Sequence, residues 1–487
     1  MKIGFDNEKY LKIQSEHIKE RINQFDGKLY LELGGKLFDD HHASRVLPGF
    51  QPDSKLRMFS KLSDSIEIVI VINAEDIEKN KVRADLGITY DEDVLRLRKE
   101  FINRGFYVGS VVITHYNGQH TAEAYKKRLN NLGIKVYFHY LIDGYPHNVS
   151  LIASDQGFGK NEYVETSREL VIITAPGPGS GKMAVCLSQL YNENKRGIRA
   201  GYAKFETFPV WSLPLKHPVN IAYEAATADL NDVNMIDPFH FDAYGKVAVN
   251  YNRDIEIFPV LNTLFQGIYG ESPYKSPTDM GVNMVGFCIS NDEVCCEASK
   301  NEIIRRYYDA AGKMALGEDN EAELNKIRML LNQVNITTDY RRCTVAAKQR
   351  RDECGHTSSA MELEDGTIIT AQSSPLLGCS AALLLNVTKH LACIDHDLKL
   401  IPQNMIEPIQ KTKIEYLRGR NPRLHTDEVL VALSVLSEND PNCEKALAQL
   451  PKLRGCQVHC TVMLSEVDRL IFKKLGVNLT CEPVRKN

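Results

Sequence analysis

The chain of 487 residues is longer than a single hydrophobic core usually organises, so we expect two to four domains. Hydrophobic residues make up 43% of it and charged residues 25%, a balance typical of globular rather than disordered proteins. The formal net charge of −4 provides no overall attraction to nucleic acid or acidic membranes, so we expect neither as a partner.

The start of the chain, MKIGFDNEKYLKIQ, lacks the apolar run of a secretory signal. No stretch approaches the roughly 20 apolar residues that a membrane helix needs. Twelve cysteines are scattered along the sequence, which favours reduced thiols over a disulfide framework. These features predict a cytoplasmic protein.

Strand and helix patterns alternate in the first part of the chain. The β-branched run IEIVIVI (residues 66–72) is typical of a strand buried on both faces. Alternating strands and helices predict βαβ units and a parallel sheet. A hairpin is predicted at residues 28–38, further strands at 106–116, 134–142 and 169–174, and helices at 91–105, 120–133 and 181–195.

Beyond residue 250 the strand patterns fade, and apolar residues recur at helical spacing until about residue 334. From residue 340 both patterns return. The predicted fold class is α/β, with a Rossmann-like, parallel, three-layer N-terminal domain (residues 1–245), a helical region (246–335) and a smaller α/β C-terminal domain (336–487).

A glycine-rich turn joins the strand LVIIT to the next helix in LVIITAPGPGSGKMAVCLSQLY. Glycine adopts backbone conformations that let consecutive N–H groups converge on an anion, and the N-terminus of the helix adds further donors. The core Pro178-Gly179-Ser180-Gly181-Lys182 resembles the P-loop of nucleotide kinases. The predicted phosphate-binding residues are Gly177, Gly179, Ser180, Gly181 and Lys182.

The turn departs from the P-loop pattern at two places. Pro176 replaces the first glycine, and neither Met183 nor Ala184 supplies the hydroxyl that usually holds Mg²⁺. The expected ligand is ATP, another nucleotide or another small phosphorylated molecule, and dependence on Mg²⁺ is left open. The alternative is a tight strand-to-helix connection with a solvated lysine.

A second group of reactive side chains lies in LFDDHHASRVLPGF. Asp39, His41, His42 and Arg45 offer a base, proton carriers and a cation for an oxyanion, so they are the predicted catalytic residues of a group-transfer site. The alternative is an exposed loop. The isolated histidines His115, His139 and His147 are instead interpreted as structural.

The segment from Cys354 to Ala392 resembles the cytidine-deaminase core, with a hairpin at Asp365-Gly366 and then a helix opening at Gly378-Cys379. In the zinc deaminases this helix opens with a metal ligand, followed by a proton-shuttling glutamate. Cys379 fits the ligand, but Ala381 stands in place of the glutamate. The required Pro-Cys-x-x-Cys is also missing, and GCQVHC (residues 455–460) lacks a partner pair. We therefore expect no metal and no structural zinc.

Nearly the whole chain resembles a bacterial family, the domain of unknown function 1846 or UPF0371-like proteins. The resemblance rests on ELGGKLFDDHHASRVLPGF, APGPGSGK and AMELEDGTIITAQSSPLLGCSAALLLN. It implies the architecture above rather than an activity. The functional hypotheses are a phosphate- or nucleotide-binding protein acting as an ATP-dependent phosphotransferase or related enzyme, a non-catalytic binding protein, and an interaction protein. A homo-oligomer is expected.

Overall fold

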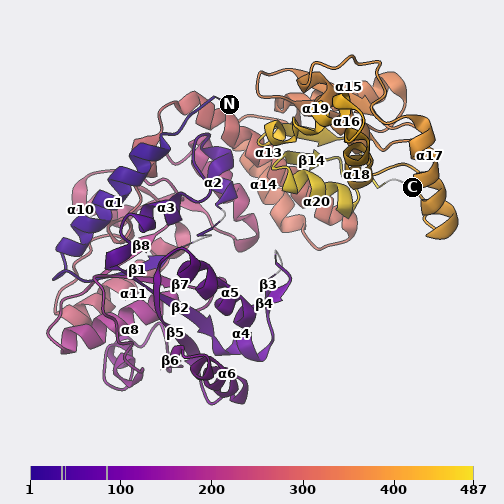
Figure 1. The fold of residues 1–487 in the computed structure, drawn as a ribbon. Coiled ribbons are helices and arrows are strands. Elements are labelled where there is room, and N and C mark those ends of the chain that lie inside the picture. The colour runs from indigo at the N-terminus through magenta and orange to yellow at the C-terminus, as the bar shows by residue number, and fades with distance from the viewer. Residues whose placement is uncertain (1, 35–36, 39, 84–85, 486–487) are drawn as a thin grey trace. The chain divides into compact units, whose positions relative to one another are not determined.

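The computed structural model describes residues 2–34, 37–38, 40–83 and 86–485. These residues divide into two units (Figure 1). The N-terminal unit comprises residues 3–224 and 232–295, and the C-terminal unit comprises residues 1–2, 225–231 and 296–487 so far as they are described. The helices of the predicted middle region are therefore shared between the units, with the boundary inside one helix, α13 (Asp292–Leu316). None of the described helices is both long and apolar enough to cross a membrane.

A six-stranded parallel sheet forms the core of the N-terminal unit, in the order β6-β5-β2-β7-β1-β8. The predicted parallel sheet is confirmed, and β2 is buried along almost its whole length as its apolar run requires. The strands are β1 (Leu29–Leu33), β2 (Ile66–Asn73), β5 (Tyr107–Tyr116), β6 (Lys135–Tyr140), β7 (Leu170–Thr174) and β8 (Gly201–Phe205).

The hairpin predicted at residues 28–38 is wrong. Its first half is the parallel strand β1, which pairs with β7 on one side and β8 on the other. All five residues of β1 are buried, and a strand in the middle of a parallel sheet satisfies their backbone groups on both edges. Strand β8 was not predicted, because GYAKF carries a glycine and a lysine and lacks a continuous apolar run.

Helices cover both faces of this sheet. In Figure 1, α8 and α11 lie on one side and α4 and α5 on the other. Two short antiparallel pairs, β3 (Val82–Arg83) with β4 (Ile88–Thr89) and β9 (Asn234–Ile236) with β10 (Val249–Tyr251), complete the strands. The helices are α1 (Asn7–Asn23), α2 (His41–Val46), α3 (Ser54–Ser60), α4 (Ala74–Glu78), α5 (Tyr90–Asn103), α6 (His120–Asn131), α7 (Val149–Ile152), α8 (Lys182–Lys195), α9 (Pro218–Ala226), α10 (Pro238–Tyr244), α11 (Asn252–Tyr269) and α12 (Pro277–Met280).

The C-terminal unit contains a four-stranded sheet in the order β12-β11-β13-β14. The predicted hairpin and the helix after it are present, as β11 (Ser358–Glu362), β12 (Ile368–Gln372) and α16 (Cys379–Leu391). Strand β13 (Gln457–Cys460) pairs antiparallel with β11 and parallel with β14 (Asn478–Cys481). The other helices are α14 (Glu321–Gln333), α15 (Arg342–Cys354), α17 (Gln403–Lys411), α18 (Thr426–Ser437), α19 (Pro441–Leu447) and α20 (Glu466–Lys474).

A buried carboxylate joins the beginnings of α18 and α20. Asp468 is 4% exposed and accepts hydrogen bonds from the Thr426 backbone N–H (2.9 Å), the Thr426 hydroxyl (2.9 Å) and His425 Nδ1 (2.9 Å). Burial alone would raise the pKa of Asp468, but these hydrogen bonds outweigh it and lower the pKa to about 2. The hydrogen bond to Asp468 raises the pKa of His425.

We expect Asp468→Asn to lower the local stability of α18 and α20 by about 2–4 kcal/mol, because it removes the charge from several buried hydrogen bonds. The Asp468 contribution is present above about pH 4 and is lost as the pH falls towards 2, whereas the His425 contribution is lost as the pH rises through its raised pKa. Hydrogen exchange of the α18 and α20 amides between pH 2 and 8 measures the change. Asp397→Asn, at an exposed carboxylate, is the control. Equal exchange rates in the two variants would contradict the prediction.

Candidate functional site

The glycine-rich turn follows β7 at the place where the direction of the strand connections reverses. From β2 the chain proceeds to β5 and β6 on one side, and from β7 it crosses β1 to reach β8 on the other side. In open parallel sheets, ligands bind beyond the carboxyl ends of the strands at such a point. The topology therefore puts residues 175–181 at the edge of the sheet where a ligand site is expected.

The turn presents a row of backbone donors. The N–H groups of residues 179–184 donate to no acceptor among the described residues, and the first hydrogen bond inside the helix runs from Val185 N–H to the Gly181 carbonyl (3.0 Å). Gly179 and Gly181 adopt φ angles of +72° and +84°. Ser180 is 3% exposed, and its buried hydroxyl also has no partner among the described residues. Unpaired donors at the N-terminus of a 14-residue helix favour an anion.

Neighbouring strands hold the turn in place. The Thr114 hydroxyl, at the end of β5, donates to the Ser180 carbonyl (2.6 Å), and Asn73, at the end of β2, donates to the Gly179 carbonyl (3.4 Å). A Cβ atom at Gly177 would lie 2.3 Å from the Tyr90 hydroxyl, so the close approach of this ring requires glycine. The carbonyls are thus tied back to the sheet while the N–H groups stay available.

Lys182 is the first residue of α8 and is half-buried. Its ammonium pairs with no carboxylate among the described residues, whereas lysines close by do: Lys81 pairs with Asp76 (3.1 Å) and Lys79 with Glu75 (2.8 Å). A cation without a counter-ion beside unpaired N–H groups adds to the positive potential of the turn.

His115 lies beside the turn, although the sequence interpretation treated it as structural. Its Cε1 atom is 3.3 Å from the position that a Cβ of Gly181 would occupy, and its Nδ1 is 3.2 Å from the Thr114 hydroxyl. Its φ angle of +53° is unusual for a residue with a side chain, and such backbone conformations concentrate at functional sites. Burial lowers the pKa of His115, although the negative charges of Glu75 and Asp76 act to raise it. Its position at the end of a predicted strand was the one sequence feature that could have indicated a role at the site.

His139, by contrast, is buried in β6, and burial lowers its pKa to about 4.

Of the predicted catalytic residues, Asp39 lies outside the described residues. His41 begins α2 and is exposed, and Arg45 lies in the last turn of this short helix. The His42 ring packs against Phe208 (centroids 5.1 Å apart) and Tyr223 (5.9 Å). Phe208 follows β8, which pairs with the edge of β1 opposite β7, the strand before the glycine-rich turn.

The neighbouring Asp40 has a structural role in the same segment. It accepts hydrogen bonds from the Ala43 N–H at the start of α2 (3.2 Å) and from the Thr207 hydroxyl (3.0 Å), and it pairs with Lys55 (3.1 Å). Burial would raise the pKa of Asp40, but Lys55 and the Ala43 N–H outweigh it and lower the pKa. This buried pair fixes the segment that follows β1.

Buried charges also gather where β8 ends. Lys204 Nζ contacts both oxygens of Asp254 (2.8 Å each) and Glu206 (3.3 Å), and it donates to the Tyr251 hydroxyl (2.7 Å). Glu32 of β1 stands opposite Lys204 in the sheet and accepts a hydrogen bond from Tyr202 (2.7 Å). A Cβ at Gly34 would overlap Glu206, so this network reaches the end of β1. It is a second group of reactive side chains that the sequence interpretation missed.

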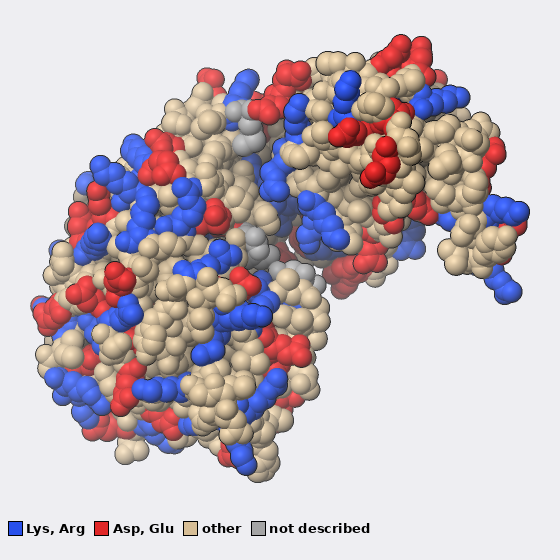
Figure 2. Space-filling view, in the orientation of Figure 1, with Lys and Arg blue, Asp and Glu red and all other residues tan. Residues whose placement is uncertain are grey.

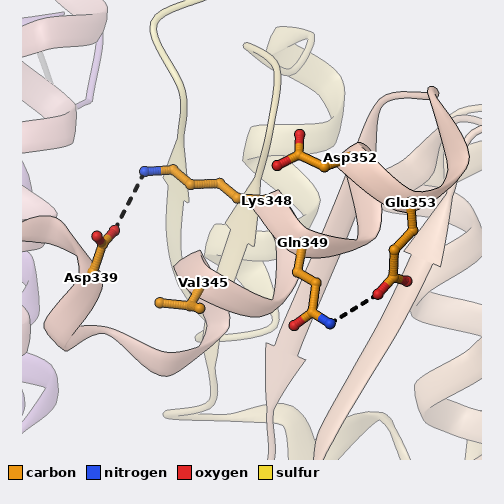
Figure 3. Close-up of a pocket in the computed structure, with 6 residues that line it drawn as sticks. All are labelled: Asp339, Val345, Lys348, Gln349, Asp352 and Glu353. Atoms are coloured by element: carbon orange, nitrogen blue, oxygen red, sulfur yellow. Dashed lines mark hydrogen bonds and ion pairs between the residues drawn. The ribbon is translucent and has the colours of Figure 1, made fainter.

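Two hollows of the surface lie away from the turn. Figure 3 shows the larger one, of about 570 Å³, on α15, where Lys348 pairs with Asp339 (3.7 Å) and Gln349 donates to Glu353 (2.8 Å). The other, of about 320 Å³, is at the amino ends of β1 and β7, the edge of the sheet opposite the turn. Figure 2 shows positive and negative side chains interspersed on the visible face. The turn's geometry, rather than either of these hollows, defines the candidate site.

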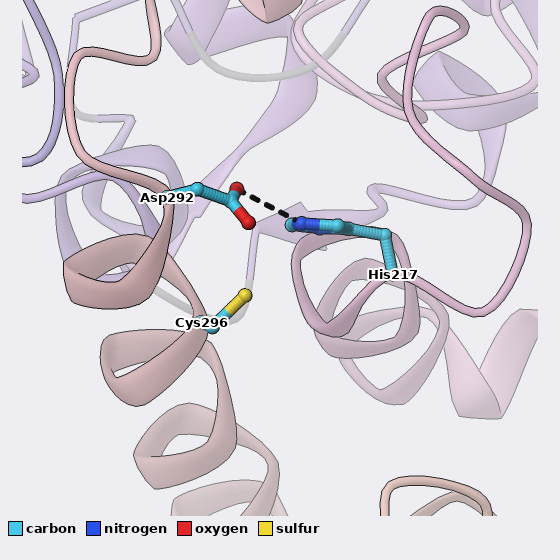
Figure 4. A group of neighbouring side chains, drawn as sticks. All are labelled: His217, Asp292 and Cys296. Atoms are coloured by element: carbon cyan, nitrogen blue, oxygen red, sulfur yellow. Dashed lines mark hydrogen bonds and ion pairs between the residues drawn. The ribbon is translucent and has the colours of Figure 1, made fainter.

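The residues considered for metal binding are dispersed or engaged in other contacts. His459 projects to the opposite face of its strand from Cys460, and its Nδ1 is 2.9 Å from the Thr480 hydroxyl. In the N-terminal unit, His217 Nε2 is 3.0 Å from Asp292, the first residue of α13 (Figure 4). Cys379 opens α16 as predicted, and Ala381 is buried in that helix.

Comparison with known families covers nearly the entire chain. The N-terminal part of the Domain of unknown function DUF1846 matches residues 3–335, and its C-terminal part matches residues 339–487. The chain belongs to this family. A UPF0371 protein of Corynebacterium urealyticum is 56% identical over 482 residues, which are 99% of this chain and 97% of the relative. A UPF0371 protein of Streptococcus thermophilus is 53% identical over 482 residues, 99% of this chain and 98% of the relative. The predicted membership of the DUF1846 family is confirmed.

Proposed function

We propose that residues 177–182 bind the phosphate groups of a small ligand, with a nucleotide such as ATP as the first candidate. The observation that supports this most directly is the row of N–H groups at residues 179–184, which find no acceptor among the described residues. Helix N-termini with such donors are anion sites, and the Lys182 ammonium would add a charge-assisted contact. Asn73 and His115, at the ends of β2 and β5, border the same space.

We further propose that the bound phosphate takes part in group transfer. The segment after β1 with His41, His42 and Arg45 starts at the same edge of the sheet, because the carboxyl ends of parallel strands share one edge. Met183 and Ala184 bring no hydroxyl, so Mg²⁺ would not be held as in a P-loop.

The twelve cysteines are all thiols, which supports the cytoplasm as the location. The alternative is a binding protein without turnover, and the homo-oligomer stays a prediction.

Lys182→Ala tests the phosphate site. We expect its affinity for ATP and for pyrophosphate to fall about 10–100-fold, because a hydrogen bond to a charged group contributes about 1.5–3 kcal/mol. Isothermal titration calorimetry with and without Mg²⁺ measures the affinity. Phosphate release from ATP in the same samples separates an enzyme from a binding protein.

Lys195→Ala is the matched control, because Lys195 lies in the last turn of the same helix and is exposed. Its affinity should equal that of the parent. The proposed phosphate site is contradicted if Lys182→Ala and Lys195→Ala both bind the two ligands like the parent. It is also contradicted if the parent binds neither ligand.

A further inference from the structure

The end of β1 is level with the first residue of α8, on the face of the sheet that this helix covers. Tyr30 of β1 faces α8, because its hydroxyl donates to Glu193 (2.6 Å) and accepts from Gln189 (3.2 Å). Side chains alternate between the faces of a strand, so a side chain at Gly34 would point to the α8 face as well. The step from Tyr30 to Gly34 advances about 13 Å, the rise of about nine residues of helix. Because α8 runs antiparallel to β1, Gly34 is level with Lys182.

The carboxyl group of Glu206 fills the space in front of Gly34. The Gly34 N–H donates to the Phe205 carbonyl (2.9 Å), so the pairing of β1 with β8 continues to this residue. A Cβ atom at Gly34 would lie 2.5 Å from Glu206 Oε1 and 2.8 Å from its Cδ. The glycine thus leaves room for the carboxyl group over the end of β1. Glu206 shares a face of the sheet with Lys182, and a level along β1.

Glu206 is the most exposed member of the buried charge network at the end of β8. Its side chain is 24% exposed, against 12% for Lys204 and for Asp254. Lys204 Nζ is 3.3 Å from Oε1, and the Tyr251 hydroxyl donates to Oε2. These two contacts fix the orientation of the carboxyl group. A carboxylate oxygen has two lone pairs, so Glu206 retains acceptor capacity for a donor that arrives from solvent.

The two ends of this space select different chemical groups. The turn with Lys182 favours a phosphate, whereas Glu206 repels a second anion and favours a hydrogen-bond donor. Strands lie about 4.8 Å apart, so the backbones of β7 and β8, on either side of β1, are about 10 Å apart. A ligand that satisfies both ends carries a phosphate on one side and hydroxyl groups on the other, which is the chemistry of a phosphorylated sugar.

We propose that Glu206 accepts hydrogen bonds from the hydroxyl groups of a sugar whose phosphate occupies the glycine-rich turn. The inference rests on the proposed phosphate site and narrows its ligand to a phosphorylated sugar, either free or as the ribose of a nucleotide. Lys204 and Tyr251 hold the carboxyl group in position from the buried side. A site built to bind a hydroxyl group rejects the analogue that lacks it, because the carboxylate is then left without a partner.

Isothermal titration calorimetry of the full-length chain with matched ligands tests the proposal. ATP is compared with 2′,3′-dideoxyATP, which lacks both ribose hydroxyls, and ribose 5-phosphate is compared with inorganic phosphate. Pyrophosphate reports on the turn alone. We expect the parent to prefer the hydroxyl-bearing ligand of at least one pair about 10–100-fold, the effect of a hydrogen bond to a charged group. The pair that shows the preference identifies the sugar as free or as part of a nucleotide.

Glu206→Gln should reduce this preference about tenfold, because an amide oxygen is a weaker acceptor than a carboxylate. It should bind pyrophosphate at least as tightly as the parent, since a negative charge is removed. Gly34→Ala should also reduce the preference, because its methyl group displaces the carboxyl group. If circular dichroism shows that Glu206→Gln fails to fold, Gly34→Ala decides.

Asp155→Asn is the matched control, because Asp155 pairs with Lys195 in the exposed last turn of α8. It should keep the preference of the parent. A parent that binds pyrophosphate but distinguishes neither pair of ligands would overturn the role of Glu206 and leave the phosphate site standing. An unchanged preference in Glu206→Gln would have the same consequence. A parent that binds none of the ligands would remove both proposals.

Discussion

Replacing Lys204 by methionine is expected to lower the free energy of unfolding of the N-terminal unit by about 3–5 kcal/mol, because it removes one partner from a buried set of charges. The Lys204 side chain is 12% exposed and contacts Asp254 and Glu206. Burial alone would lower the pKa of Lys204, but the attraction of these carboxylates outweighs it and raises the pKa. Methionine keeps the volume and removes the charge. The buried carboxylate of Asp254 and the half-buried carboxylate of Glu206 would then lack their cation.

The loss of stability in Lys204→Met should depend on pH. Burial raises the pKa of Glu206, and Lys204 works against that rise. Without the ammonium the pKa of Glu206 rises further, so its charged form is costly at high pH and its neutral form is tolerated at low pH. The difference between parent and variant should therefore be larger at pH 8 than at pH 5.

Urea unfolding followed by the fluorescence of Trp211, the single tryptophan of the chain, reports on this unit. Lys195→Met is the control, since Lys195 pairs with Asp155 at the surface and such pairs contribute little. A comparable loss in the two variants, or the same loss at pH 5 and pH 8, would contradict the assignment of Lys204 to a buried charge network.

The sequence predicts those parts of the fold whose local pattern agrees with their final environment. IEIVIVI is apolar throughout, and it lies inside the sheet as β2. The predicted helices at residues 91–105 and 120–133 end at glycines and correspond to α5 and α6. Strand β8 was not predicted, because Lys204 interrupts its apolar pattern. The buried charge of Lys204 is tolerated only because Asp254, in a helix about 50 residues further along the chain, contacts it. No local pattern contains that partner.

The sequence likewise predicts some residues of the candidate site and not others. The turn was predictable because glycines, lysine and the beginning of a helix are contiguous in sequence. His115 and Asn73 were not, because only the order of the strands brings the ends of β5 and β2 beside this turn. Chemistry assembled by long-range pairing leaves no motif at fixed spacing.

Gly181→Ala is expected to reduce the affinity for pyrophosphate at least about 100-fold, the effect of losing two hydrogen bonds to a charged group. Gly181 has a φ angle of +84°, and a Cβ there would lie 3.2 Å from both Cγ2 and Oγ1 of Thr114. The new methyl group pushes the turn away from β5, which holds the Ser180 carbonyl. The N–H groups that follow would then no longer converge. Isothermal titration calorimetry measures the change.

Gly197→Ala separates backbone strain from damage to the turn. Gly197 follows the other end of α8, has a φ angle of +80°, and has nothing within 4 Å of an added Cβ. Both variants should lose about 1–2 kcal/mol of stability, since alanine is disfavoured at positive φ. Only Gly181→Ala should lose affinity as well, because only its methyl group meets Thr114. If the two variants bind pyrophosphate equally well, the anion is held elsewhere in the protein.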